Sequence, residues 1–315
     1  MNFEVVLANG TIINANQTAN ADLWQALKGG SNNFGIVTRF DMEAIPSPDV
    51  FSDTRFLSFD YVDAMVDAVV GFADSDESIV DDAFFMFVSH ETTFSPDIFT
   101  AGVHVNTQGI TNSNTPFDEV KALPTLTNIT TVENIAEAAF ASQVQSGTWN
   151  YGLTLTFNND PRIAHLCVEL HTELVESLKT LMAPEDFFTQ MFLQPLPSYR
   201  WPLGEAHGGN VLGLDNLTNN ALLFTAGVGI FTDDAPADAA HAQLKAMAAK
   251  IVDFAKSVQG DMDFIYLNYA DSDQSPLSTY GAANIKLMKD VAAKYDPTGV
   301  FQTLIPGGYK ISQVD

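Results

Sequence analysis

The segment Asp22-Leu-Trp-Gln-Ala-Leu-Lys-Gly-Gly-Ser-Asn-Asn-Phe-Gly-Ile-Val-Thr-Arg-Phe40 decides the fold of the first part of this 315-residue chain. Asp22–Lys28 has the composition of a short helix, with Asn20 or Asp22 as its cap and two glycines to end it. A loop that contains glycine follows, and Ile36–Ala44 then has the character of a strand. The cluster Pro46-Ser-Pro48 closes this strand and is the best candidate for a domain boundary.

A β-hairpin is predicted upstream of this segment. Phe3–Leu7 and Thr11–Ala15 are largely apolar and flank Asn9-Gly10. Asn-Gly between two apolar runs is the strongest short-range signal for a hairpin. The start of the chain therefore combines paired strands with a helix.

The loop Gly29–Gly35 has two interpretations. Glycines there let the backbone pass close to a bulky ligand and adopt positive φ angles. The simpler interpretation is a helix C-cap followed by an ordinary loop. The loop is not a G-x-G-x-x-G fingerprint. It follows a helix and precedes a strand, whereas a Rossmann nucleotide site requires a strand followed by a helix, so that kind of site is excluded.

The middle of the chain alternates short apolar strands with amphipathic helices, and several strands pair as neighbours. This pattern predicts an α+β fold with a large antiparallel sheet backed by helices, rather than a doubly wound parallel sheet. The expected strands are Phe51–Phe59, Ala83–Ser89, Phe99–Asn106, Gly152–Phe157, Phe188–Gln194, Leu222–Phe231 and Phe264–Asn268. The expected helices are Val62–Ala73, Pro116–Ala122, Arg162–Met182 and Ala237–Val258.

Composition excludes several classes of partner. Hydrophobic residues make up 46% of the chain and charged residues 17%, as in a compact globular protein. The net charge of −25 repels phosphate backbones, so neither nucleic acid nor a membrane is an expected partner. Apolar runs are too short to span a bilayer, and no signal peptide begins the chain. The sequons at Asn16, Asn128 and Asn216 are about as many as chance would give and are weak evidence of glycosylation.

Metal and nucleophile chemistry has little support. Cys167 is the only cysteine, lies in a helix-like apolar stripe and is expected to pack in the core. The histidines are scattered, and no metal site is predicted. Asp271-Ser-Asp273 lacks the rest of a calcium loop and is interpreted as loop capping. His207-Gly-Gly-Asn210 is interpreted as a turn, with a place beside the substrate as the alternative.

Tyr266-Leu-Asn-Tyr-Ala-Asp271 ends the last expected strand. A phenol with a reference pKa near 10 is a poor base at neutral pH unless its anion is stabilised. Strict strand alternation would place Tyr266 and Tyr269 on opposite faces, and an aromatic pair that packs a domain seam is the purely structural alternative. Tyr280-Gly281 follows, and Lys294-Tyr-Asp-Pro-Thr-Gly-Val-Phe301 then stops a helix and makes a turn.

Together, these terminal segments resemble the flavin-dependent oxidases of the vanillyl-alcohol-oxidase superfamily, in particular the fungal berberine-bridge-enzyme-like branch. The resemblance is strong over residues 1–46 and 262–310 and implies FAD as the cofactor. It implies that Tyr269 is the catalytic base, with Tyr266 as the alternative. The residues that it places at the flavin are Gly30, Asn33, Gly35, Ile36, Val37 and Asn268.

The resemblance also divides the chain. Residues 1–46 are expected to be the C-terminal part of a FAD-binding domain, 47–268 a substrate domain and 269–315 a return to the FAD-binding domain. Members of the family begin with a long lobe that attaches FAD through histidine and often cysteine, and that lobe is missing from this sequence. We therefore expect the isolated chain to bind FAD weakly and to be inactive alone, with an exposed apolar edge on the hairpin Phe3–Ala15.

The function implied is a flavin-dependent oxidation of an alcohol, sugar or secondary metabolite, with hydride transfer to FAD and dioxygen as the acceptor. The alternative is a truncated, flavin-free protein that binds a ligand without enzymatic activity, or an inactive fragment. A glycosidase with paired carboxylates is poorly supported, because no acidic pair is marked by its spacing. Relatives are often secreted, but this sequence leaves the localisation unknown.

Overall fold

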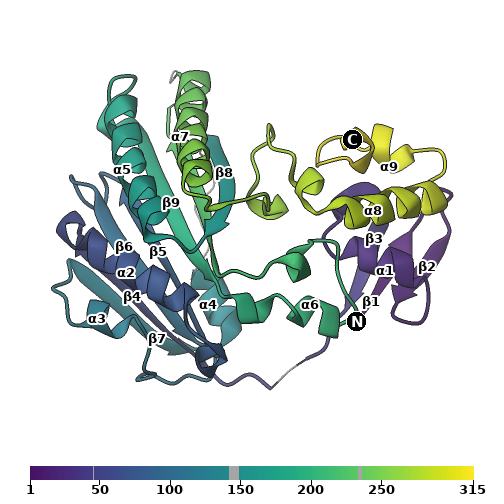
Figure 1. The fold of residues 1–315 in the computed structure, drawn as a ribbon, viewed down its shortest axis with the longest axis horizontal. Coiled ribbons are helices and arrows are strands. Elements are labelled where there is room, and N and C mark those ends of the chain that lie inside the picture. The colour runs from purple at the N-terminus through teal and green to yellow at the C-terminus, as the bar shows by residue number, and fades with distance from the viewer. Residues whose placement is uncertain (45, 142–148, 233–235) are drawn as a thin grey trace. The chain divides into compact units, whose positions relative to one another are not determined.

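The computed structural model describes residues 1–44, 46–141, 149–232 and 236–315. The chain forms two compact units (Figure 1). Unit 1 consists of Met1–Ile45, Arg200–Thr218 and Asp263–Asp315, and unit 2 consists of Pro46–Tyr199 and Asn219–Met262. Among the described residues, no helix has both the length and the apolar character needed to cross a membrane.

Unit 1 is built on a three-stranded antiparallel sheet with the order β2-β1-β3. The predicted hairpin forms β1 (Asn2–Val6) and β2 (Ile12–Asn16), with Phe3 opposite Ala15. β3 (Ile36–Asp41) pairs with the other edge of β1, so β1 is the central strand. β2 remains an edge strand, and its Ile12 is 63% exposed. Phe3 and Val5 of the central strand are consequently buried.

The helices described in unit 1 are α1 (Ala21–Leu27), α6 (Leu203–Ala206), α8 (Ala282–Tyr295) and α9 (Val300–Thr303). Of these, α1 packs against β2 of the sheet and against α8. The expected side-chain cap of α1 is absent: Asn20 donates to the Asn14 carbonyl oxygen instead. Asp22 accepts hydrogen bonds from Lys294 Nζ at 2.7 Å and from the Tyr295 hydroxyl at 2.9 Å, which ties α1 to α8.

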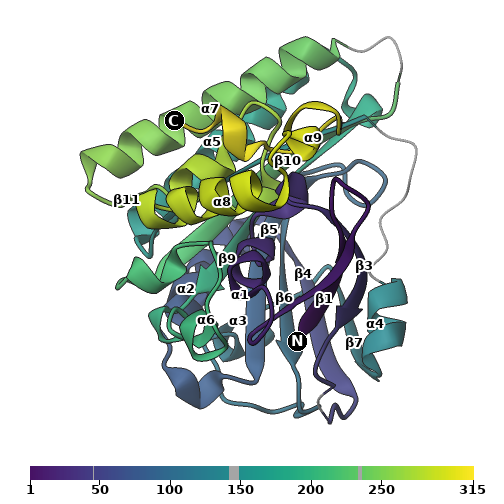
Figure 2. The ribbon, with the colours of Figure 1, turned by 90° about the vertical axis from the view of Figure 1, so that its right-hand side faces the viewer.

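Unit 2 contains an eight-stranded antiparallel sheet with the order β11-β8-β10-β9-β5-β6-β4-β7, and Figure 2 shows several of these strands side by side. Its strands are β4 (Val50–Ser58), β5 (Asp82–His90), β6 (Phe99–Asn106), β7 (Thr127–Glu133), β8 (Trp149–Asn158), β9 (Phe187–Leu196), β10 (Ala221–Ile230) and β11 (Asp261–Met262). Its helices are α2 (Val62–Ala73), α3 (Asp118–Lys121), α4 (Ile135–Ala141), α5 (Pro161–Leu178) and α7 (Ala237–Ser257). The predicted α+β class with a large antiparallel sheet backed by helices is confirmed.

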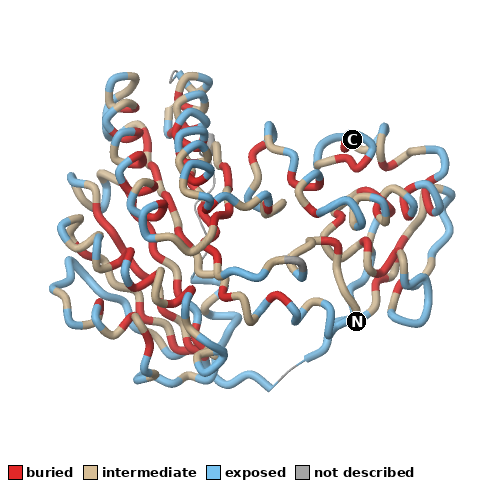
Figure 3. The backbone as a smooth tube through the Cα atoms, in the orientation of Figure 1, coloured by how far each residue is buried: buried red, intermediate tan, exposed pale blue. Residues whose placement is uncertain are grey.

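The core of unit 2 lies between one face of this sheet and the helices α2, α5 and α7. Alternate residues of each strand point to this side, for example Met86 and Val88 of β5, and the apolar stripe of α5 meets them. Figure 3 shows the buried residues along these strands and helices. Cys167 is fully buried in this core, as predicted, and burial raises the pKa of its thiol far above its usual range.

Three differences from the expected elements concern local structure. Phe264–Asn268 is not a strand, and Leu267–Tyr269 forms one turn of 3₁₀ helix instead. β7, β11, α4, α6 and α9 were not expected, and α8 is the helix that Lys294–Phe301 was expected to stop. Unit 1 also contains Arg200–Thr218 and takes up the chain again at Asp263, whereas the sequence placed both stretches in the middle domain. The assignment of 1–46, 47–268 and 269–315 to FAD-binding and substrate domains stays a prediction.

Candidate functional site

The loop after α1 is held in place by Asn33, whose side chain is fully buried. Asn33 Nδ2 donates to the carbonyl oxygens of Gly30 at 2.8 Å and Tyr309 at 2.9 Å. Its Oδ1 accepts the backbone N–H of Ile311 at 2.9 Å. Both N–H groups of the Asn33 amide are thus engaged with the backbone of unit 1, so the side chain has no free donor for a cofactor.

Two glycines of this loop are required by packing within unit 1. A Cβ atom added at Gly30 would lie 2.5 Å from the ring of Phe34. One added at Gly35 would lie 2.5 Å from Val5 Cγ1 on the central strand. Real Cβ contacts are never this short, so glycine is needed at both positions whether or not a ligand approaches.

The strand that follows the loop is more accessible. Ile36 and Val37 open β3, an edge strand, where they pair with Val6 and Val5 of β1. The residue Ile36 is 55% exposed. An edge strand keeps one row of backbone N–H and C=O groups outside the sheet, and these groups can bind a ligand.

The two candidate tyrosines lie next to each other, contrary to the alternation expected of a strand. Tyr266 precedes the 3₁₀ turn and Tyr269 ends it, and side chains three residues apart eclipse in this geometry. Their rings pack edge to face with centroids 5.0 Å apart. Asn268 Nδ2 donates to the Tyr266 hydroxyl oxygen at 2.8 Å, while Tyr269 is 41% exposed.

Tyr309 links the tyrosine segment to the glycine loop. Its carbonyl oxygen accepts from Asn33, and its hydroxyl donates to the carbonyl oxygens of Ala270 at 2.7 Å and Asp271 at 2.8 Å. The two sequence segments that carry the family resemblance are therefore bonded to one residue within unit 1. Tyr309 was not among the site residues predicted from the sequence, although Gly307-Gly308 just before it, both with positive φ angles, mark a constrained backbone.

Two further groups near these segments were also missed. The residue Lys310 is only 6% exposed, and its ammonium donates a long hydrogen bond of 3.4 Å to Asn32 Oδ1. Burial lowers the pKa of Lys310. Tyr280 is fully buried, its ring stacks on Phe264, and burial raises the pKa of its phenol.

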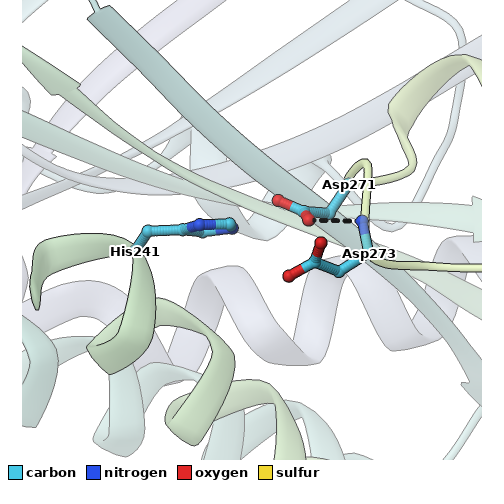
Figure 4. A group of neighbouring side chains, drawn as sticks. All are labelled: His241, Asp271 and Asp273. Carbon is cyan, nitrogen blue, oxygen red and sulfur yellow. Dashed lines mark hydrogen bonds between the residues drawn. The ribbon is translucent and has the colours of Figure 1, made fainter. Parts of the chain in front are cut away.

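The acidic pair after the tyrosines behaves as a capped loop (Figure 4). The Asp271 carboxylate accepts the backbone N–H of Asp273 at 2.9 Å, and the Asp271 N–H donates to Gln274 Oε1 at 3.0 Å. The third residue drawn, His241, belongs to α7 of unit 2. The pair is explained by the turn that it makes.

The segment His207-Gly-Gly-Asn210 is a turn against α1. Gly208 and Gly209 have φ angles of 83° and 72°, which favour glycine. Lys28 Nζ donates to the carbonyl oxygens of His207 and Gly208, both at 3.3 Å, and lies 3.5 Å from the centroid of the Trp24 ring. A cavity of about 290 Å³ beside this turn is lined by residues of unit 1 such as Gln25, Asn210 and Asn284.

Several relatives named as FAD-dependent monooxygenases match almost the whole chain. No family model matches the chain. The chain is 31% identical over 325 residues to the FAD-dependent monooxygenase drtC of Aspergillus calidoustus. The aligned region covers 100% of this chain and 60% of the relative. It is 31% identical to the FAD-dependent monooxygenase sdcF of Emericella nidulans, over 99% of this chain and 65% of the relative. The chain thus spans about three fifths of the length of these relatives.

Solved structures show the same fold. A variant of berberine bridge enzyme superposes with a TM-score of 0.69 and 13% identity, over 99% of this chain and 65% of the other. A chitooligosaccharide oxidase superposes with a TM-score of 0.68 and 16% identity, over 98% of this chain and 66% of the oxidase. These comparisons confirm the predicted resemblance: the chain has the fold of VAO-type flavoproteins, in the group that includes berberine bridge enzyme. They also confirm FAD as the cofactor of this class.

Proposed function

We propose that this chain takes part in a FAD-dependent oxidation of a small molecule, such as an alcohol, a sugar or a secondary metabolite. The observation that carries the proposal is the bonding of Tyr309 to both the Asn33 loop and the tyrosine segment. This contact supports a single site in unit 1 built from the segments that carry the resemblance. The relatives named as FAD-dependent monooxygenases support the cofactor.

Several features of unit 1 fit FAD. The outer edge of β3 at Ile36 and Val37 offers backbone groups, and Asn268 is an exposed side chain beside the tyrosines. The desolvated Lys310 is a cation for which an anionic group of the dinucleotide would be a better partner than Asn32 Oδ1 at 3.4 Å. Gly30, Gly35 and Asn33 would shape the loop rather than bind through side chains. When bound, FAD supplies an acceptor for the two electrons of a hydride.

Tyr269 is the proposed base that takes the substrate proton, because it is exposed to solvent whereas Tyr266 is half-buried. Tyr266 is the alternative, since its oxygen already accepts a hydrogen bond from Asn268. A positioned general base contributes about a hundredfold or more to a rate. Tyr269→Phe removes only the hydroxyl and keeps the ring contact with Tyr266, so its effect separates chemistry from packing.

The test compares Tyr269→Phe and Tyr266→Phe in protein that carries bound FAD, with absorbance near 450 nm as the measure of bound flavin. We expect Tyr269→Phe to lower turnover about a hundredfold at unchanged flavin content. A comparable loss in Tyr266→Phe alone would move the role to that residue. Near-normal turnover in both variants would refute a tyrosine base, and colourless protein would favour the flavin-free binding protein.

A monooxygenase reaction is the second candidate, and the names of the relatives favour it. Dioxygen is the co-substrate of an oxidase and of a monooxygenase alike. The two reactions differ in the fate of the oxygen atoms. Reaction under ¹⁸O-labelled dioxygen decides between them: an oxidase releases labelled peroxide, whereas a monooxygenase transfers one labelled atom to the product.

A further inference from the structure

The second face of the sheet in unit 2, opposite α2, α5 and α7, carries no charged side chain on its six central strands. The alternation and register of the strands define this open face. Its members include Ser52, Thr54, Phe56, Phe85, Phe87, Ser89, Phe99, Ala101, Val103, Val105, Gly152, Thr154, Thr156, Phe188, Gln190, Phe192, Leu223, Thr225, Gly227 and Gly229. Part of this face is covered, since Phe99, Ala101 and Thr154 are buried. Gly152, Phe188, Gln190 and Phe192 are partly exposed.

A groove with a glycine floor crosses this open face. Gly227 of β10 lies opposite Gly152 of β8, and Gly229 lies opposite Phe188 of β9. The cavity has a volume of about 210 Å³, and its lining also includes Phe192. The floor is therefore backbone, and the wall is aromatic.

The aromatic wall continues beyond the groove. Phe192 lies 5.6 Å from Phe87 and 5.9 Å from Phe85, measured between ring centroids. Phe188 lies 5.6 Å from Phe231, which is 48% exposed. Such centroid distances are typical of favourable aromatic pairs, and a further flat ring can join the row at the same spacing.

Packing accounts for Gly229 and constrains Gly227, where an added Cβ atom would lie 3.0 Å from the Tyr151 carbonyl oxygen, but it does not account for Gly152. A Cβ atom at Gly229 would overlap the ring of Phe188, so that glycine is required by its cross-strand neighbour. A Cβ atom at Gly152 would meet only the Ala226 carbonyl oxygen, at an ordinary 3.6 Å. Glycine inside a strand weakens the strand. The protein thus keeps a residue at position 152 that its own packing does not need, and the result is open space above the sheet.

We propose that this groove binds a flat, uncharged aromatic molecule, with one ring over Gly152 and Gly227 and its edge against Phe188 and Phe192. The side-chain amide of Gln190, opposite Gly227, offers the polar contact. The hydroxyl of Thr225 is already used, because it donates to the Leu153 carbonyl oxygen at 2.9 Å.

A sugar is a poorer occupant of the same groove. Its hydroxyl groups would need several hydrogen-bond partners, and each one left unpaired on burial costs free energy. The side-chain amide of Gln190 is the group in this groove that we expect to hydrogen-bond a ligand, and one amide cannot satisfy several sugar hydroxyl groups. The inference rests on the proposed function only in calling the ligand a substrate, since it concerns binding and not turnover.

Isothermal titration of the full 315-residue chain tests the proposal, with 1,8-dihydroxyanthraquinone as the flat probe and cellobiose as the sugar. Gly152→Val fills the floor with a side chain that strands favour, and Phe188→Leu removes part of the aromatic wall. The matched control is Thr156→Val on the same strand and face, where the hydroxyl has no hydrogen-bond partner among the described residues. Circular dichroism checks that each variant is folded.

We expect the anthraquinone to bind and cellobiose not to bind. Gly152→Val should weaken the anthraquinone about tenfold or more and Phe188→Leu about threefold or more, with Thr156→Val unchanged. Binding that survives both groove variants, binding of cellobiose alone, or no binding at all would overturn the proposal. So would a dimer in sedimentation that Gly152→Val dissociates, because a second copy would then cover the face.

The flavin content of the same samples separates this inference from the proposed function. A colourless protein that binds the anthraquinone in the groove supports the inference and contradicts the flavin-dependent reaction. A protein that holds flavin and ignores the anthraquinone supports the reaction and overturns the inference.

Discussion

Replacing Asn33 by alanine should destabilise unit 1 strongly, because the side chain makes three buried hydrogen bonds to backbone groups. They join Asn33 to Gly30, Tyr309 and Ile311 at 2.8, 2.9 and 2.9 Å. Each backbone group left unsatisfied on burial costs roughly 1–3 kcal/mol. With partial relaxation and access of water, we expect a total of about 3–5 kcal/mol, a large part of the roughly 5–15 kcal/mol that holds a domain folded.

The assay is urea denaturation together with hydrogen exchange at the Ile311 amide, which loses its acceptor in Asn33→Ala. Asn32→Ala is the matched control: the same residue type in the same loop, with one long contact of 3.4 Å to Lys310, and we expect a loss below about 1 kcal/mol. A free energy of unfolding for Asn33→Ala within about 0.5 kcal/mol of wild type would refute the structural role. If flavin binding then fell instead, Asn33 would be a direct cofactor contact.

Three further predictions follow from other buried groups. Burial lowers the pKa of His171 to about 3, so below the unfolded value of about 6.5 only the unfolded state gains a proton. The contribution of His171 to the free energy of unfolding should be fully present above about pH 6.5 and should fall by up to about 1.4 kcal/mol per pH unit towards pH 3. The urea midpoints measured at pH 7 and pH 4.5 should therefore differ less in His171→Gln than in the wild type. Tyr309→Phe removes the hydroxyl that two carbonyl oxygens accept and should cost about 1–2 kcal/mol, with faster hydrogen exchange in the tyrosine segment; unchanged exchange would contradict the link. Cys167 should resist a thiol reagent in native protein and react only in urea, and rapid native labelling would disprove its burial.

The candidate site shows where local patterns stop being informative. The sequence indicated that the loop and the tyrosine segment belong together, and both proved to be bonded to Tyr309. The resemblance places Asn33 at the cofactor, which stays a prediction, and the structure shows that this side chain also holds the C-terminal tail through the Ile311 N–H. It also expected a strand through Tyr266, because an apolar run gives no local signal for one turn of 3₁₀ helix. Spacing along the chain cannot identify a hydrogen-bond partner that lies 276 residues away.

The sequence by itself determined the elements whose signals are local: the Asn-Gly hairpin, the helix Val62–Ala73 and most strands of the large sheet. Helical and strand periods of hydrophobicity are properties of a few neighbouring residues, so they can be recognised without the rest of the molecule. Only the tertiary structure decided the order of the eight strands, the inclusion of Arg200–Thr218 in unit 1 and the charge-free open face. These features depend on which distant strands pair and in which register, because a shift of one residue exchanges the two faces of a strand.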